Sequence, residues 1–273
     1  MQQALDFLEE SKSLFKLVES LNDEDLKRET SFKKWTLNDV FSHLHVWNYA
    51  ADLSLKGDDD FLTFFEELSA QLSTGKTLRE AEQAFLNGLS GRELVNTWKD
   101  FYLPMSDRFR ESDPSMRVKW AGPDMSVRSS ITARLMETWA HGQEIYDVLG
   151  VVRSNEDRIR NIVVLGNNTY GWTYHVRSEQ PPEPVPHLKL TAPSGEIWAY
   201  NELSNNEIIE GRAEEFCQVV TQVRNIADTD LVVTGDNATS WMSKAQCFAG
   251  AAQSPPSPGA RKTAAKTIFG SDS

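Results

Sequence analysis

Glu137 and His141 are the residues whose types and spacing point most directly to chemistry. They lie four positions apart in residues 134–150, a stretch whose pattern predicts a helix. At 3.6 residues per turn, side chains four positions apart lie on one face of a helix. A carboxylate and an imidazole placed in this way can both reach one divalent metal ion. The pattern therefore predicts two ligands of a metal site.

A further ligand has to come from another helix, because apolar neighbours such as Leu135 and Trp139 place this helix inside a bundle. The best donors elsewhere are His43 and His45, in a second expected helix. These two histidines point about 200° apart around the helix, so they cannot serve one site together. Three protein ligands and one open position are typical of a catalytic metal site.

The same residues also have an ordinary structural interpretation. Glutamate and histidine four residues apart often make a simple contact along a helix. His43 could then be a solitary core histidine, and Glu137 a buried acid paired with Arg134. Arg128 and Arg134 could contact an anion, but ion pairs with nearby acids are the simpler expectation. Periodicity alone favours this structural interpretation.

Four substantial helices are expected to position the site, over residues 4–21, 37–55, 134–150 and 155–176, with shorter helices between them. An antiparallel bundle is the economical packing for them. Thr36 with Asp39, and Ser126, are the expected helix caps, and Gly150 is an expected helix end. Pro104 is expected to kink or break the helix over residues 91–110.

The amino-acid composition changes at the proline-rich residues 180–186, which indicate a domain junction. Beyond it, residues 187–200 predict a hairpin, and strands and helices alternate to about residue 248. The fold class is therefore α+β, with a helix bundle over residues 1–179 and a small α/β domain over residues 186–250 that docks on it. Residues 251–273 are expected to be a disordered tail.

Composition limits the classes of partner. The chain has 273 residues and a formal net charge of −12, which argues against nucleic acid or an anionic membrane as partner. Cys217 and Cys247 form no Cys-x-x-Cys pair, so a thiol redox centre is not indicated. We expect no signal peptide and no bilayer-spanning run, and we expect a cytoplasmic monomer or homodimer acting on a small molecule.

Two motifs carry a resemblance to a known family. Trp35-Thr36 with Asp39-Val40 and His43-Leu44, followed by Glu137-Thr-Trp-Ala-His141, resembles the DinB-like superfamily of metal-binding helix bundles. The chain is more similar to the branch that includes mycothiol-dependent maleylpyruvate isomerase. Within that branch it is most similar to an uncharacterised family with a motif like residues 133–150. The resemblance extends to about residue 250.

The resemblance implies a ligand set and a metal. His43, Glu137 and His141 occupy the metal-ligand positions, with His43 favoured over His45, and zinc is the expected metal. The small C-terminal domain is expected to be sterol-carrier-like. Apart from the resemblance, Glu144 lies one turn beyond His141 and either holds a ligand imidazole or is a solvated acid. Trp47 either walls the pocket or packs in the core.

Three functions remain open at this point. The first is a metal-dependent isomerase or transferase, in which the ion activates a low-molecular-weight thiol that adds to a small electrophilic substrate; the thiol step rests on the resemblance alone. The second is a thiol-independent hydrolase or hydratase that uses water activated by the metal. The third is a non-enzymatic, metal-containing ligand-binding protein.

Overall fold

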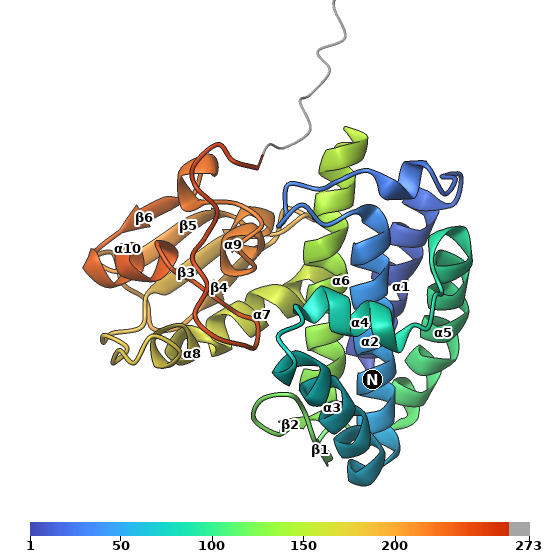
Figure 1. Cartoon of the computed structure of the whole chain (residues 1–273). Coiled ribbons are helices and arrows are strands. Elements are labelled where there is room, and N and C mark those ends of the chain that lie inside the picture. The colour runs from blue at the N-terminus through green and yellow to red at the C-terminus, as the bar shows by residue number, and fades with distance from the viewer. Residues whose placement is uncertain (262–273) are drawn as a thin grey trace, which may run out of the picture.

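The computed structural model describes residues 1–261, which form a helical region and a smaller mixed region side by side (Figure 1). The helical region is built on four long helices: α1 (Gln2–Val18), α2 (Leu37–Lys56), α5 (Gly91–Glu111) and α6 (Val127–Leu149). Both α1 and α2 pack against both α5 and α6. The shorter helices α3 (Asp58–Ser73) and α4 (Leu78–Phe85) pack on α2, and the 3-10 turn η1 (Asp25–Lys27) contacts it.

The helix ends confirm the caps predicted from the sequence. The Thr36 hydroxyl accepts a hydrogen bond from the Asp39 amide at 3.1 Å, and the Asp39 carboxylate accepts one from the Thr36 amide at 2.9 Å. Ser126 caps α6 through the Ser129 amide. Helix α6 ends at Gly150, whose φ of 68° lies in the left-handed region that favours glycine. These caps fix where the two site-bearing helices begin and where α6 stops.

The prediction of one continuous fourth helix over residues 155–176 is wrong. The structure divides it into η2 (Asp157–Ile159), α7 (Arg160–Asn168) and α8 (Tyr170–His175). Helix α7 packs on the smaller region, and a Cβ added at Gly166 would lie 2.9 Å from Val220. The fourth long helix is instead α5, which continues through Pro104 to Glu111, so the break that the sequence offered as the alternative to a kink does not occur.

The smaller region is a four-stranded mixed sheet covered by helices. Its strands are β3 (His187–Thr191), β4 (Ile197–Tyr200), β5 (Ile208–Arg212) and β6 (Val232–Thr234), in the order β4-β3-β5-β6. Strands β3 and β4 form the predicted hairpin, with Leu190 opposite Trp198, while β3 and β5 are parallel. Helices α9 (Ala213–Val220) and α10 (Asp236–Met242), and the turn η3 (Ile226–Asp228), complete it.

One hydrophobic core joins the two regions. It runs from Phe7 and Trp98 of the bundle to Phe216 and Trp241 of the smaller region. The smaller region therefore docks on the bundle, as the sequence predicts. A two-stranded ribbon, β1 (Arg117–Val118) and β2 (Met125–Ser126), leads into α6. No helix within residues 1–261 has the length and apolar character needed to cross a membrane.

Residues 249–261, here called the C-terminal strap, lie on the protein surface between the two regions. The Gln253 amide donates to Gln246 at 2.9 Å, Asn225 donates to the Pro256 carbonyl at 2.8 Å, and the Gly259 amide donates to Asp228 at 2.8 Å. The structure thus places residues 251–261, which the sequence assigns to a disordered tail, in specific contacts. Residues 262–273 of that tail lie outside the described residues.

Candidate metal centre

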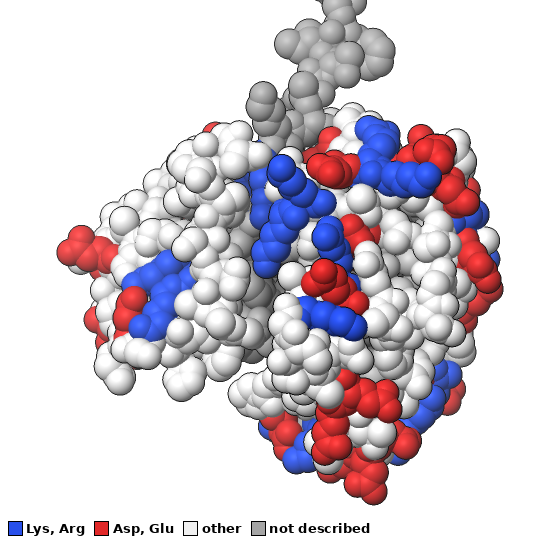
Figure 2. Space-filling model, viewed as in Figure 1, with Lys and Arg blue, Asp and Glu red and all other residues white. Residues whose placement is uncertain are grey.

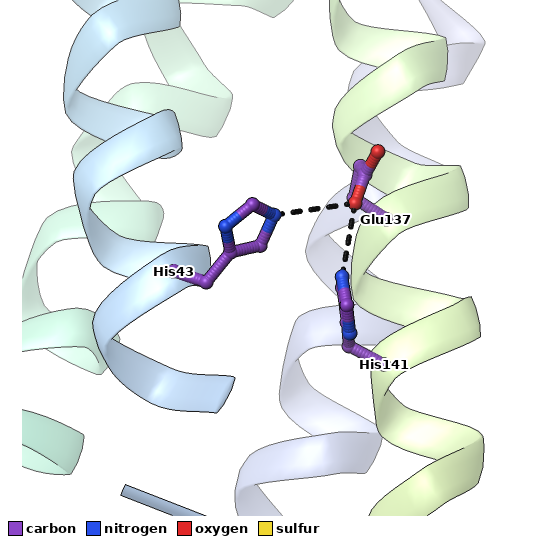
Figure 3. Close-up of side chains that lie close together, drawn as sticks. All are labelled: His43, Glu137 and His141. Carbon is purple, nitrogen blue, oxygen red and sulfur yellow. Dashed lines mark ion pairs between the residues drawn. The ribbon is translucent and has the colours of Figure 1, made fainter. Parts of the chain in front are cut away.

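Three of the predicted site residues meet between α2 and α6 (Figure 3). The Glu137 Oε2 atom lies 3.2 Å from His141 Nε2 and 3.4 Å from His43 Nε2. One donor atom from each residue lies within 4.8 Å of the other two. His43 and His141 are both 8% exposed, whereas the Glu137 side chain is 22% exposed, so two buried imidazoles meet a carboxylate that is still partly open to the cavity.

His43 rather than His45 belongs to this group. The His45 ring points away from it and packs edge-on against Phe101 of α5, with ring centroids 5.4 Å apart. Burial lowers the pKa of His45 to about 4, so the ring is neutral near pH 7. The register favoured by the sequence motif is therefore the one that the structure adopts.

Glu82 is the site residue that sequence reasoning missed. It lies on α4 with no exposed surface, and its Oε1 accepts hydrogen bonds of 2.7 Å from His43 Nδ1 and Trp47 Nε1. The sequence does carry a signal that Glu82 is buried. The spacing of Leu78, Ala81, Glu82 and Phe85 places all four on one face of a helix. A carboxylate in such an apolar stripe needs a partner inside the protein.

The two auxiliary residues from the sequence have different roles. Trp47 is 9% exposed and holds Glu82, so it supports His43 indirectly. Glu144 lines the cavity beside the site, and its Oε1 accepts a hydrogen bond from Arg261 Nη1 at 2.8 Å. Among the described residues it contacts neither His43 nor His141, and the carboxylate that contacts His43 Nδ1 is Glu82.

The two arginines singled out in the sequence do not pair with Glu137. Arg134 is buried on α6, and its Nε donates to Asn48 Oδ1 at 3.0 Å. Arg128 is exposed near the start of α6. The expected ion pair between Arg134 and Glu137 is therefore absent from the contacts of residues 1–261, although the two charges still act on each other.

The charges of the three residues are strongly coupled. Burial alone would lower the pKa of His43, but the carboxylates of Glu82 and Glu137 raise it to about 9. Burial would raise the pKa of Glu137, but the two imidazoles hold it well below its usual range. The pKa of His141 is lowered by burial and by the charge of His43, despite Glu137. The Glu137 carboxylate is therefore anionic, and a divalent ion would displace the proton of His43, because a ligand imidazole must be neutral.

Aromatic rings enclose the His141 side of the centre. The Trp35 ring stacks on the His141 ring, with centroids 5.7 Å apart and planes within 8°, and the Phe32 ring meets His141 edge-on at 5.2 Å. Both aromatics come from one tight turn, closed by a 2.9 Å hydrogen bond from the Trp35 amide to the Phe32 carbonyl. Lys33 and Lys34 between them have φ of 50° and 57°, an uncommon conformation for residues with side chains.

A cavity of about 570 Å³ opens beside the three donors. Its walls come from α2, α4, α6, the Phe32–Trp35 turn, residues 221–223 just after α9, and the C-terminal strap. Apolar wall residues include Phe32, Leu78 and Met136, and the cations Lys33, Arg79 and Arg261 also line it. Figure 2 shows Lys and Arg side chains gathered over the hollow between the two regions.

The residues present fit a divalent ion. Two imidazole nitrogens and one carboxylate oxygen are a common ligand set for zinc, and the cavity leaves room for a further ligand. The Nδ1 atom of His43 is engaged by Glu82, so its Nε2 atom faces Glu137 and His141. A carboxylate that orients a ligand histidine in this way is a usual companion of metal sites.

Comparison with known proteins identifies the family. Residues 7–146 match the family described as the mycothiol maleylpyruvate isomerase N-terminal domain. The chain belongs to this family. The resemblance found in the sequence motifs is thereby confirmed, and the matched span contains His43, Glu82, Glu137 and His141.

Relatives and solved structures agree with this assignment. Two uncharacterized proteins from strains of Mycobacterium tuberculosis are 32% identical over 245 residues, which cover 90% of this chain and 94% of each relative. Crystal structures of the mycothiol-dependent maleylpyruvate isomerase and of a mutant of it align with a TM-score of 0.51 and 14% identity. The alignment covers 80% of this chain and 87% of the isomerase chain, so the overall fold is shared.

Proposed function

We propose that the protein is a metal-dependent enzyme whose ion, most simply zinc, is held by His43, Glu137 and His141. The proposed reaction is isomerisation or group transfer on a small electrophilic substrate, assisted by a low-molecular-weight thiol. The observation that carries the proposal is the convergence of these three donors on the wall of a cavity. The thiol rests on the family, which includes a mycothiol-dependent isomerase.

The chain supplies binding and orientation in this proposal. A bound divalent ion would lower the pKa of a thiol or water that contacts it. The apolar walls Phe32, Leu78 and Met136 exclude water from the reacting groups, which strengthens the electrostatic interactions there. Lys33 and Arg79, at the same cavity, favour negative charge on the substrate.

Metal analysis of protein purified without added metal tests the proposal. Wild-type protein is expected to carry about one ion per chain, and His141→Ala to carry almost none, because two remaining ligands seldom retain zinc. His45→Ala is the matched control, since it removes an imidazole from the same region that lies outside the group. Equal metal content in all three proteins, or none in the wild type, would contradict the proposed centre.

Thiol dependence separates the proposed reaction from metal-assisted hydrolysis. The cobalt-substituted wild-type protein is expected to change its visible absorption when a small thiol is added, because sulfur alters the ligand field of the ion. His141→Ala is expected to show no change. Turnover of electrophilic substrates that needs no thiol would favour a hydrolase or hydratase instead.

A further inference from the structure

A buried polar array lies behind His43, on the side away from the cavity. Its centre is Glu82, whose Oε1 accepts hydrogen bonds from both His43 and Trp47 at 2.7 Å. Glu82 is fully buried, although it comes from a short helix outside the four long ones. Burial of a carboxylate costs several kcal/mol unless hydrogen bonds and positive charge compensate for it. The neighbours of Glu82 must provide that compensation.

Arg134 and Asn48 are a second buried polar pair, which is linked to Glu82 by charge and not by a hydrogen bond in residues 1–261. Arg134 is 1% exposed and lies one turn before Glu137 on α6, where the carboxylates of Glu137 and Glu82 both act on its charge. Its Nε donates to Asn48, a fully buried residue of α2. Within residues 1–261, Glu82 Oε2, Arg134 Nη2 and Asn48 Nδ2 have no hydrogen-bond partner. One acceptor and two donors thus retain bonding capacity in the same buried region.

Hydrogen bonding alone does not require a carboxylate at position 82. The neutral amide oxygen of a glutamine would also accept bonds from His43 and Trp47. A glutamate adds a negative charge, which offsets the charge that a divalent ion and Arg134 would bring into the same low-dielectric region. Glu137 alone would leave two positive charges uncompensated, and Glu82 reduces this excess to one.

We propose that Glu82 is a positioning residue of the metal centre, which holds His43 with Nε2 toward the ion and strengthens metal binding through its charge. The proposal rests on the proposed metal site and adds a residue from α4 to it. Loss of a carboxylate that orients a ligand histidine costs roughly 10- to 100-fold in metal affinity. Glu82→Gln should lie near the lower end of this range and Glu82→Ala near the upper end.

Helix α4 becomes part of the metal centre through this contact. The helix has only eight residues, and its first turn is held by a capping box between Thr77 and Glu80. A second link is the 2.6 Å hydrogen bond from Gln83 to Asp39. Since Glu82 connects α4 to His43, metal binding should slow amide exchange in residues 78–85 of the wild-type protein.

Competition with a chromophoric chelator for zinc and cobalt, at one fixed pH, tests the proposal. The variants are Glu82→Gln and Glu82→Ala, and Glu80→Gln is the matched control. Glu80 lies on the same helix and undergoes the same chemical change, but its carboxylate binds Thr77 and does not contact His43. The control should keep wild-type metal affinity. Both Glu82 variants should lose affinity, and Glu82→Ala should lose more than Glu82→Gln.

Two further readouts distinguish positioning from general support of the fold. The visible spectrum of the cobalt-loaded Glu82→Ala protein should differ from that of wild type, because His43 is no longer fixed. Exchange in residues 78–85 should stop responding to metal in both Glu82 variants, and should still respond in Glu80→Gln.

The outcomes separate this proposal from the function on which it rests. Wild-type affinity in both Glu82 variants, or an equal loss in Glu80→Gln, would overturn the role of Glu82 and leave the centre of His43, Glu137 and His141 intact. A wild-type protein that binds no metal would overturn both.

Discussion

At the scale of single residues, Glu144 and Arg261 form an ion pair at the edge of the cavity. The carboxylate is 2% exposed and the guanidinium comes from the C-terminal strap. Burial raises the pKa of Glu144 from 4.5 to about 7, and Arg261 offsets only part of that effect. Desolvation therefore outweighs the attraction between the two charges.

Glu144→Gln should change how stability depends on pH. Between pH 4.5 and about 7 the folded protein keeps a proton on Glu144 that the unfolded chain has lost. The stability that Glu144 contributes is therefore complete below pH 4.5 and is lost as the pH rises through about 7. Glutamine cannot ionise, so the variant should gain stability over wild type across this interval, by up to about 3 kcal/mol. Urea unfolding of metal-free protein at several pH values measures the difference. A difference that does not vary with pH would contradict the raised pKa.

The three residues of the candidate site could be predicted from the sequence, but the residues that support them could not. Glu137 and His141 share one helix face, so their proximity follows from local geometry, and the motif around His43 added the third residue. The contact between Glu82 and His43 joins residues 39 positions apart on different helices. No local pattern encodes such a contact, and only the apolar spacing around Glu82 hints at its burial.

At the scale of elements, α5 shows why a proline need not end a helix. An interior proline costs about 3 kcal/mol. The helix buries Trp98 and Tyr102 before Pro104, and Met105 and Phe109 after it. Each such side chain contributes roughly 1.5–3 kcal/mol when buried, so packing against α1 and α2 outweighs the loss. The prediction of a break gave the local rule too much weight.

Pro104→Ala should therefore stabilise the protein. Pro104 is exposed, so its replacement removes little packing and restores a helical hydrogen bond. The expected gain is about 1–3 kcal/mol in the free energy of unfolding, lowered slightly by the greater freedom of the unfolded chain. Urea titration gives the value. Leu103→Ala, an exposed neighbour, serves as control and should change stability by about 0.5 kcal/mol or less. A loss of stability in Pro104→Ala would show that the helix depends on the proline.

At the scale of the whole molecule, the cavity belongs to both regions. The three proposed ligands come from the bundle, while Thr221, Gln222, Val223 and the C-terminal strap supply the opposite wall. The sequence predicts that the regions dock, because the smaller one has little core of its own. The cavity between them could not be predicted, since it depends on contacts such as Glu144 with Arg261, which are 117 residues apart.

A chain that ends at residue 250 should still bind metal but release it faster. All three proposed ligands remain in this variant, so the metal content should equal that of wild type. This truncation removes most of the strap, and with it part of one cavity wall and the partner of Glu144, which opens the site to water and to competing chelators. Stopped-flow transfer of cobalt to a chelator measures the release rate. A rate equal to that of wild type would show that the strap does not limit access.

The order of these parts along the chain also bears on biosynthesis. The four long helices, two of which carry the three donors, are complete at Leu149, whereas the opposite wall ends at Arg261. At roughly 5–20 residues per second, a ribosome needs on the order of 6–22 s to make the intervening segment. For that time the bundle presents the three proposed ligands through an open side, before the C-terminal strap is made and covers them.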